Sequence, residues 1–233
     1  MKILDGKVLG VIGGMGPMAT DMFYKMITQN TKVKCDQEHI NMIILSHATM
    51  PDRTKALKDG ETDLVLEKLM NDAKFLKNSG ADFVVIPCNT AHAIFAEPAK
   101  ANDIPFINMI EETANKAAAM VGKGGKVGVM ATDGTIEIGL YQNALNKLGI
   151  EAVTLSKGHQ SKVMKIIYEG IKMGEPVNHE DFQKAAEELK AQGCQLIILG
   201  CTELSVYKIE EGLGEFYLDA MECLVNKAIE ACR

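Results

Sequence analysis

The chain has 233 residues, of which 47% are hydrophobic and 24% charged, with a formal net charge of −6 at pH 7. This apolar content is sufficient for a buried core in one large domain or two smaller ones, which excludes a disordered chain. The negative charge disfavours a nucleic-acid partner, because phosphate binding needs a basic surface. The segment Met1–Lys7 carries charges where a signal peptide needs an apolar core, and no apolar run approaches the roughly 20 residues of a membrane span. We therefore expect a cytoplasmic protein with neither a nucleic-acid nor a membrane partner.

Short apolar runs rich in β-branched residues alternate with helical patterns along the chain. The expected strands, in chain order, are Lys7–Ile12, Met42–Leu45, Phe83–Ile86, Phe106–Asn108, Lys126–Met130, Ala152–Leu155 and Leu196–Leu199. Helices such as Thr62–Lys77 and Glu180–Gln192 lie between them, and Gly80, Gly149 and Gly193 follow helices as C-terminal caps. Continuous apolar strands separated by helices predict an α/β fold with mainly parallel sheets flanked by helices.

The chain also contains an internal repeat. The segment Gly80–Thr90 resembles Gly193–Glu203 position by position, each with a glycine cap, an apolar strand and then a cysteine. A similar offset relates Lys7–Ile12 to Lys126–Met130. These matches predict two pseudo-symmetric α/β subdomains, with the active site in the cleft between them.

The six cysteines show neither a C-x-x-C pair nor a zinc-type spacing, so we expect reduced thiols and no metal. Four of them lie where a free cysteine usually serves as a small apolar residue: Cys35, Cys194, Cys223 and Cys232. Cys88 and Cys201 instead follow predicted strands, and ligands of parallel α/β proteins bind beyond the carboxyl ends of strands. Both are therefore candidate catalytic residues.

Two thiols in equivalent positions suit one class of reaction in particular. Inversion at carbon needs a base on one face and an acid on the other, and a thiol before a helix N-terminus can supply either form. No lysine-bearing motif for a pyridoxal cofactor is evident, so we expect no cofactor, and preorganised donors must stabilise the developing charge. The candidate donors follow the strands, where they are also typical helix caps: Asn89, Thr90, Thr132 and Thr202.

Six segments carry a resemblance to a known family: Gly10–Pro17, Met50–Thr54, Pro87–His92, Ala131–Thr135, Lys162–Glu169 and Gly200–Leu204. On these motifs the chain resembles the aspartate/glutamate racemase family over essentially its whole length. The resemblance implies a pyridoxal-independent racemase in which Cys88 and Cys201 are the acid/base pair. It also implies a homodimer, with one subdomain formed by residues 1–105 and about 210–233, and a second formed by residues 106–209.

The branch of the family bears on the substrate. Glutamate racemases carry an Asp-Ser pair after the first strand and a histidine after the second cysteine motif, where this chain has Gly14-Met15-Gly16 and Glu203. It therefore resembles the aspartate and broad-specificity branch. Arg53 and Lys162 match family positions that hold the substrate's distal carboxylate, which a cationic pair would favour. The resemblance thus implies an acidic amino acid, with aspartate preferred and broad specificity open, bound by Met15, Arg53, Asn89, Thr90, Thr132, Lys162, Thr202 and Glu203.

Three other functions compete with this interpretation. The segment Gly14–Ala19 fits the nucleotide-binding pattern G-x-G-x-x-A, but the next strand runs into Ser46-His47 and lacks the acidic residue of such sites. A hydrolase or lyase would use one cysteine as a nucleophile with His92 or His47 as its partner, and the presence of two matched cysteines argues against it. A binding protein that senses a dicarboxylate without turnover is the third.

Overall fold

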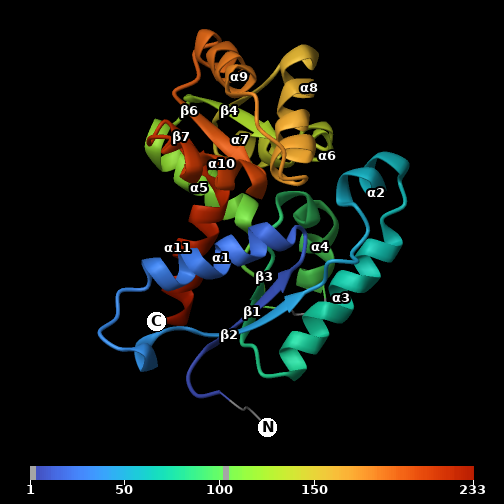
Figure 1. The fold of residues 1–233 in the computed structure, drawn as a ribbon, viewed down its shortest axis with the longest axis vertical. Coiled ribbons are helices and arrows are strands. Elements are labelled where there is room, and N and C mark those ends of the chain that lie inside the picture. Colours follow the sequence, from blue (N-terminus) through green and yellow to red (C-terminus); the bar gives the residue numbers. More distant parts are fainter. Residues whose placement is uncertain (1–3, 102–104) are drawn as a thin grey trace. The chain divides into compact units, whose positions relative to one another are not determined.

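The computed structural model describes residues 4–101 and 105–233, so the first residues of the segment Met1–Lys7 lie outside it. The chain forms two compact units, one of residues up to Met109 together with Met221–Arg233, the other Ile110–Ala220 (Figure 1). In the described part of the chain, no helix is long and apolar enough to cross a membrane.

The first unit contains a three-stranded parallel sheet in the order β2-β1-β3. Its elements are β1 (Val8–Gly13), α1 (Pro17–Asn30), η1 (Asp36–Glu38), β2 (Asn41–Ser46), α2 (Arg53–Asp59), α3 (Asp63–Asn78), β3 (Phe83–Val85), α4 (Asn89–Ala101) and α11 (Ala220–Cys232). The C-terminal helix is tied to this unit by two hydrogen bonds, from Lys7 Nζ to Ala231 O at 2.7 Å and from Arg233 Nη2 to Lys32 O at 2.6 Å.

The second unit contains a four-stranded parallel sheet in the order β5-β4-β6-β7. Its elements are α5 (Met109–Val121), β4 (Lys126–Ala131), α6 (Asp133–Glu137), α7 (Leu140–Lys147), β5 (Glu151–Thr154), α8 (Lys157–Lys165), the π-helical segment η2 (Ile166–Ile171), α9 (His179–Ala191), β6 (Leu196–Gly200), α10 (Thr202–Glu211) and β7 (Tyr217–Asp219). The chain returns to the first unit at Met221, later than the predicted position near residue 210, because β7 pairs with β6.

The predicted α/β class with parallel sheets flanked by helices is confirmed. The predicted strand Phe106–Asn108 is reduced to a single bridge between Phe106 and Val84, and β7 was not predicted. The predicted glycine caps are confirmed, since Gly80, Gly149 and Gly193 follow helix ends with positive φ angles of 102°, 75° and 87°.

A close contact between helix and sheet recurs in both units. A Cβ atom placed on Gly10, in β1, would lie 3.3 Å from Leu76 Cβ of α3, and one on Gly128, in β4, would lie 3.2 Å from Leu189 Cβ of α9. Glycine is needed at both positions because the helix lies too close for a side chain on the central strand. Gly13 faces the other side of β1, where its Cβ would meet Thr20 of α1 at 2.4 Å. Helices therefore cover both faces of the first sheet.

A pair of hydrogen bonds at the start of the central strand also recurs in both sheets. Val8 N–H donates to Asp82 Oδ2 at 2.7 Å, and Asp82 N–H donates to Val8 O at 2.9 Å. In the second unit, Lys126 N–H donates to Gln195 Oε1 at 3.2 Å, and Gln195 N–H donates to Lys126 O at 2.9 Å. Asp82 and Gln195 are separated by the same number of residues as Cys88 and Cys201. The same local bonding at matched positions supports the duplication that the sequence predicts.

The packing at Gly10 generates a stability prediction. Gly10→Val should lower the free energy of unfolding by about 1–3 kcal/mol, the usual cost of overpacking a core, because Ala81, Val84 and Leu76 all surround the new side chain. Urea unfolding followed by circular dichroism measures the change.

Gly158→Ala is the matched control. Gly158 lies in the first turn of α8, and a Cβ added there would have nothing within 4 Å, so the alanine should raise stability by up to about 1 kcal/mol. Equal effects of the two substitutions would show that the contact at Gly10 does not limit the packing.

Candidate active site

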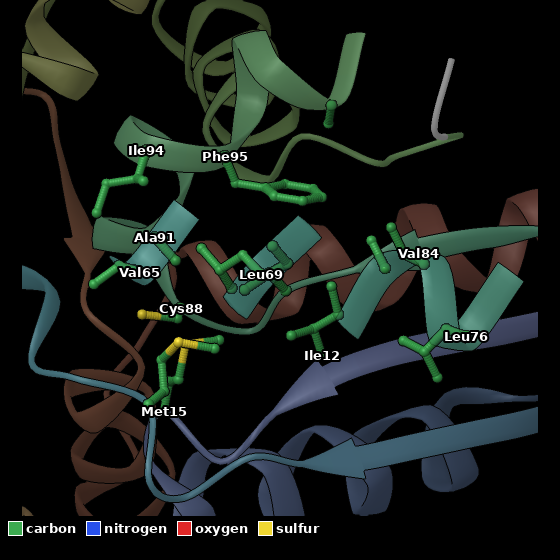
Figure 2. Close-up of a cluster of buried hydrophobic side chains, with 14 of the residues drawn as sticks. Ile12, Met15, Val65, Leu69, Leu76, Val84, Cys88, Ala91, Ile94 and Phe95 are labelled. Carbon is green, nitrogen blue, oxygen red and sulfur yellow. The ribbon is translucent and has the colours of Figure 1, made fainter. Parts of the chain in front are cut away.

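In the first unit, the chain beyond β3 places Cys88 in the hydrophobic core. Its side chain is buried, with 7% of the residue exposed, and its N–H donates to Ile86 O at 2.8 Å. Cys88 belongs to the same apolar cluster as Met15 and Ala91, and Figure 2 shows Cys88 and Met15 at one end of this cluster. The strand therefore delivers the thiol to the carboxyl edge of the sheet, as predicted.

Arg53 joins the loops that follow β1 and β2. It is 8% exposed, and its guanidinium donates to the carbonyl oxygens of Met15 at 3.4 Å, Met50 at 3.3 Å and Pro51 at 2.9 Å. It is thus a buried residue at the start of α2, and Met15 is its direct neighbour. The structure brings together these two predicted binding residues in the unit that holds Cys88.

Asn89 and Thr90 form the first turn of α4, directly after Cys88. They are 2% and 5% exposed. Both predicted residues therefore lie buried at the start of the helix that the cysteine precedes, where backbone N–H groups are available to a negative charge.

His92 is a structural residue of this turn. Its Nδ1 lies 2.9 Å from Cys88 O, and its Nε2 accepts a hydrogen bond from Met109 N–H at 3.1 Å. Because Nε2 is an acceptor, Nδ1 carries the proton and donates to the carbonyl. Burial lowers the pKa of His92 to about 4. Both ring nitrogens of the neutral imidazole are engaged by the backbone, which removes His92 as the partner base of a single-cysteine hydrolase.

His47 follows β2 and pairs with a carboxylate of α3. Its Nδ1 lies 2.8 Å from Asp72 Oδ2, and its backbone N–H donates to Gly13 O at 3.1 Å. The backbone of His47 also packs against Gly14, where an added Cβ would lie 2.5 Å from it and where φ is 84°. His47 therefore holds the loop that carries Met15.

In the second unit, Thr132 and Cys201 follow paired residues. Ala131 at the end of β4 pairs with Gly200 at the end of β6, so the next residue of each strand lies at the same edge of the sheet. Thr132 is 3% exposed and caps α6, accepting from Thr135 N–H at 3.4 Å. Its predicted capping role is thus observed, at a position next to the second cysteine.

Cys201 and Glu203 form a direct thiol–carboxylate hydrogen bond. Cys201 is the N-cap of α10 and is 7% exposed, and its Sγ donates to Glu203 Oε2 at 2.8 Å. Thr202 Oγ1 lies 3.4 Å from the same oxygen. Burial, followed by the negative charge of Glu203, raises the pKa of the Cys201 thiol well above its usual range. For this cysteine the carboxylate and burial outweigh the expected stabilisation of a thiolate by the helix N-terminus.

Two lysines occupy different positions in this unit. Lys162 Nζ lies 2.8 Å from Asp181 Oδ1 of α9, and this bond lowers the pKa of Asp181. Lys172 Nζ instead lies 3.9 Å from Glu203 Oε1 and 3.9 Å from the centre of the Tyr168 ring. Lys172 directly follows the π-helical segment η2, whose wider turn no sequence pattern announces. It is therefore a cation near Cys201 that the sequence did not single out.

Within the described ranges 4–101 and 105–233, no group of three or more histidine, cysteine or acidic side chains is arranged to hold a metal ion. What each unit offers is a buried thiol at the carboxyl edge of a parallel sheet, with polar residues on the helix turn that directly follows it. In parallel α/β proteins, ligands bind at this edge of the sheet, so the edge that carries each thiol is the candidate site.

The comparison with known proteins identifies the family. Residues 12–228 match the Asp/Glu/hydantoin racemase family, and the chain belongs to this family. Its enzyme class is therefore that of a racemase, an isomerase.

Three relatives illustrate the similarity. The broad specificity amino-acid racemase RacX of Bacillus subtilis is 28% identical over 229 residues, which cover 95% of this chain and 96% of the relative. The solved structure of Picrophilus torridus aspartate racemase matches with a TM-score of 0.78 and 26% identity, covering 97% of this chain and 94% of that one. A structure from Yersinia pestis assigned to the Asp/Glu racemases matches with a TM-score of 0.81 and 28% identity, covering 97% and 99%.

The buried neutral imidazole of His92 generates a pH prediction. Its pKa is lowered to about 4 in the folded chain from 6.5, so the unfolded chain binds the proton more readily. The stabilisation is complete above pH 6.5 and is lost as the pH falls toward 4, by on the order of 3 kcal/mol. Urea unfolding between pH 7 and pH 4 measures this loss.

His92→Gln is the comparison variant, because its amide oxygen can still accept from Met109 N–H but does not titrate in this range. The fall in stability between pH 7 and pH 4 should be smaller in the variant. An identical fall in both proteins would show that His92 does not cause it.

Proposed function

We propose that this chain racemises an acidic amino acid, with aspartate as the first candidate, by a two-base mechanism. Cys88 and Cys201 are the acid/base pair: the thiolate of one removes the α-proton, and the thiol of the other donates a proton to the opposite face of the carbanion. The observation that carries this proposal is the equivalence of the two thiols. Each follows the third strand of a parallel unit, at the carboxyl edge, and each is 7% exposed.

The other groups of the two edges have chemistry that fits an amino-acid substrate. The buried first turn of α4, with Asn89 and Thr90, offers donors for a carboxylate, and Thr132 and Thr202 offer hydroxyl groups in the second unit. We assign these four residues to substrate binding and to stabilisation of the developing negative charge. The mechanism as proposed uses side chains alone and assigns no step to a cofactor.

The proposal of an acidic substrate rests on a cationic side chain that could bind the substrate's second carboxylate. In the first unit this cation is Arg53, with Met15 beside it. In the second unit the family resemblance points to Lys162, and Lys172 is a second candidate. Both lysines are paired with a carboxylate, Lys162 with Asp181 and Lys172 with Glu203, but only Glu203 contacts Cys201. The similarity to RacX keeps broad specificity as the second candidate, in which the same thiols act on several amino acids.

The remaining features of the proposal concern the setting of the enzyme. We place it in the cytoplasm as a homodimer acting on a small molecule, without nucleic-acid or membrane partners. The net charge of −6 supports the absence of a nucleic-acid partner.

The first experiment is incubation of the purified protein with L-aspartate in D2O, followed by NMR of the Cα proton and by optical rotation. Racemisation with deuterium entering Cα is the expected outcome. Cys88→Ser and Cys201→Ser should each lower the rate by at least about 10²-fold, because a hydroxyl is a poor acid/base group at neutral pH and such groups contribute about 10²–10⁴. Full activity in either variant would contradict the two-base assignment, and inertness toward aspartate, glutamate and neutral amino acids would contradict the function.

A second experiment separates the two lysines. Lys172→Met should raise the KM for aspartate by about tenfold or more, while Lys162→Met should leave it within about twofold, because only Lys172 lies beside the group that contacts Cys201. Initial rates over a range of aspartate concentrations give both values. The reverse order would return the carboxylate-binding role to Lys162.

A further inference from the structure

Among the matched positions beside the two cysteines, one differs in charge between the two units. Cys88 is followed at the second position by Thr90, and Cys201 by Glu203. The two pairs are related by the same offset as Asp82 and Gln195, whose backbone contacts are the same in both units. One thiol therefore has a neutral hydroxyl at this helical position, and the other has a carboxylate.

The carboxylate is placed to act on the thiol. Glu203 is 5% exposed, and its Oε2 accepts the Cys201 Sγ proton at 2.8 Å. Its other oxygen faces the Lys172 ammonium at 3.9 Å, and attraction between the opposite charges holds the carboxylate in this orientation. In a buried setting a negative charge beside sulfur favours the neutral thiol over the thiolate.

We propose that Glu203 is a positioning residue that keeps Cys201 protonated in the free enzyme. Before substrate binds, Cys201 is then the acid and Cys88 the base. The inference rests on the proposed two-thiol mechanism and adds an order to it. The enantiomer whose α-proton faces Cys88 meets an enzyme in the correct protonation state. The opposite enantiomer requires the proton to move from Cys201 to Cys88 first.

The charged and titratable groups around Cys201 agree with this role. Glu203 comes from its own helix and Lys172 from the end of η2, and they act in opposite directions on the thiol. Tyr207 of α10 lies in the same core cluster, and burial raises its pKa to about 12, so it stays neutral. Glu203 bonds directly to the thiol, whereas Lys172 contacts the other oxygen of the same carboxylate, and of the two charges Glu203 has the larger effect on the pKa of Cys201.

The ratio of the steady-state rates for the two enantiomers cannot test this proposal. A racemisation of free enantiomers has an equilibrium constant of one, so kcat/KM is equal in the two directions for every variant. Site-resolved alkylation by iodoacetamide measures protonation directly, because only the thiolate reacts. Peptide mass spectrometry assigns the rate at each cysteine as a function of pH, in the absence of substrate. The rate at high pH normalises for any difference in access between the two thiols.

In the wild type, Cys88 should reach half of its maximal rate at a lower pH than Cys201. Glu203→Gln should raise the labelling of Cys201 at pH 7 by about tenfold or more and leave that of Cys88 unchanged, because removing an adjacent negative charge restores thiolate. Glu210→Gln is the matched control, an exposed glutamate on the same helix with the same change of charge, and it should alter neither rate. Thr90→Glu should slow the labelling of Cys88 at pH 7.

Unchanged labelling of Cys201 in Glu203→Gln, or equal pH profiles of the two thiols in the wild type, would overturn the proposal. Because labelling needs no turnover, these results are independent of the exchange experiment in D2O. Racemisation with equal thiol profiles would reject the role of Glu203 alone. Unequal profiles without any exchange would instead reject the racemase function.

Discussion

The close approach of one helix to the central strand of each sheet is the constraint on which the placement of the thiols depends. At Gly10 and Gly128 the absence of a side chain lets α3 and α9 pack directly on the sheet. Strand β3 follows α3 and pairs with β1, and β6 follows α9 and pairs with β4, the central strand of the second sheet. Since each of these strands leads into a cysteine, a glycine at the centre of the sheet helps to determine where the thiol at its edge lies.

The same packing explains why the two halves retain one geometry although their sequences differ. Val8 and Lys126 bond to Asp82 and Gln195 in the same way, although one partner is an acid and the other an amide. At this structural position only the acceptor oxygen matters, so the charge is free to vary. At the position that Thr90 and Glu203 share, only the second unit has a charge, and that charge contacts the Cys201 thiol.

Much of the fold could be predicted because its signals are local. The buried strands are continuous apolar runs, and Gly80, Gly149 and Gly193 occupy positions of positive φ that few other residues adopt. The strand β7 was missed because Tyr217–Asp219 is short and is defined by pairing with β6 rather than by its own pattern. The predicted strand at Phe106–Asn108 was wrong because its apolar pattern suggested a strand, whereas only Phe106 pairs, in a single bridge with Val84.

Residues of the candidate site could be predicted from the sequence only where a chemically reactive residue type directly follows a predicted strand. Cys88 and Cys201 meet both conditions, so sequence alone singled them out. The roles of His92 and Lys172 depend on tertiary contacts: the imidazole is engaged by the backbone of Cys88 and Met109, and the lysine reaches Glu203 after a π-helical segment. The spacing after Cys88 left His92 open as a partner base, and the family resemblance pointed to Lys162 as the cation. Neither signal records what each side chain contacts.

The difference between the two half-sites also bears on how a nearly symmetric protein can work on mirror-image substrates. No arrangement of residues can alter the equilibrium between free enantiomers, so a catalyst gains nothing there from perfect internal symmetry. In the proposed mechanism, symmetry in the backbone still has a use, because inversion at carbon needs equivalent groups on the two faces of one carbon. An acid and a base are nevertheless different species, and a free enzyme holding one proton between two identical thiols would divide itself between two forms. The role proposed for Glu203 removes this division: a single buried carboxylate, bonded to one thiol, favours one of the two forms while the scaffold remains duplicated.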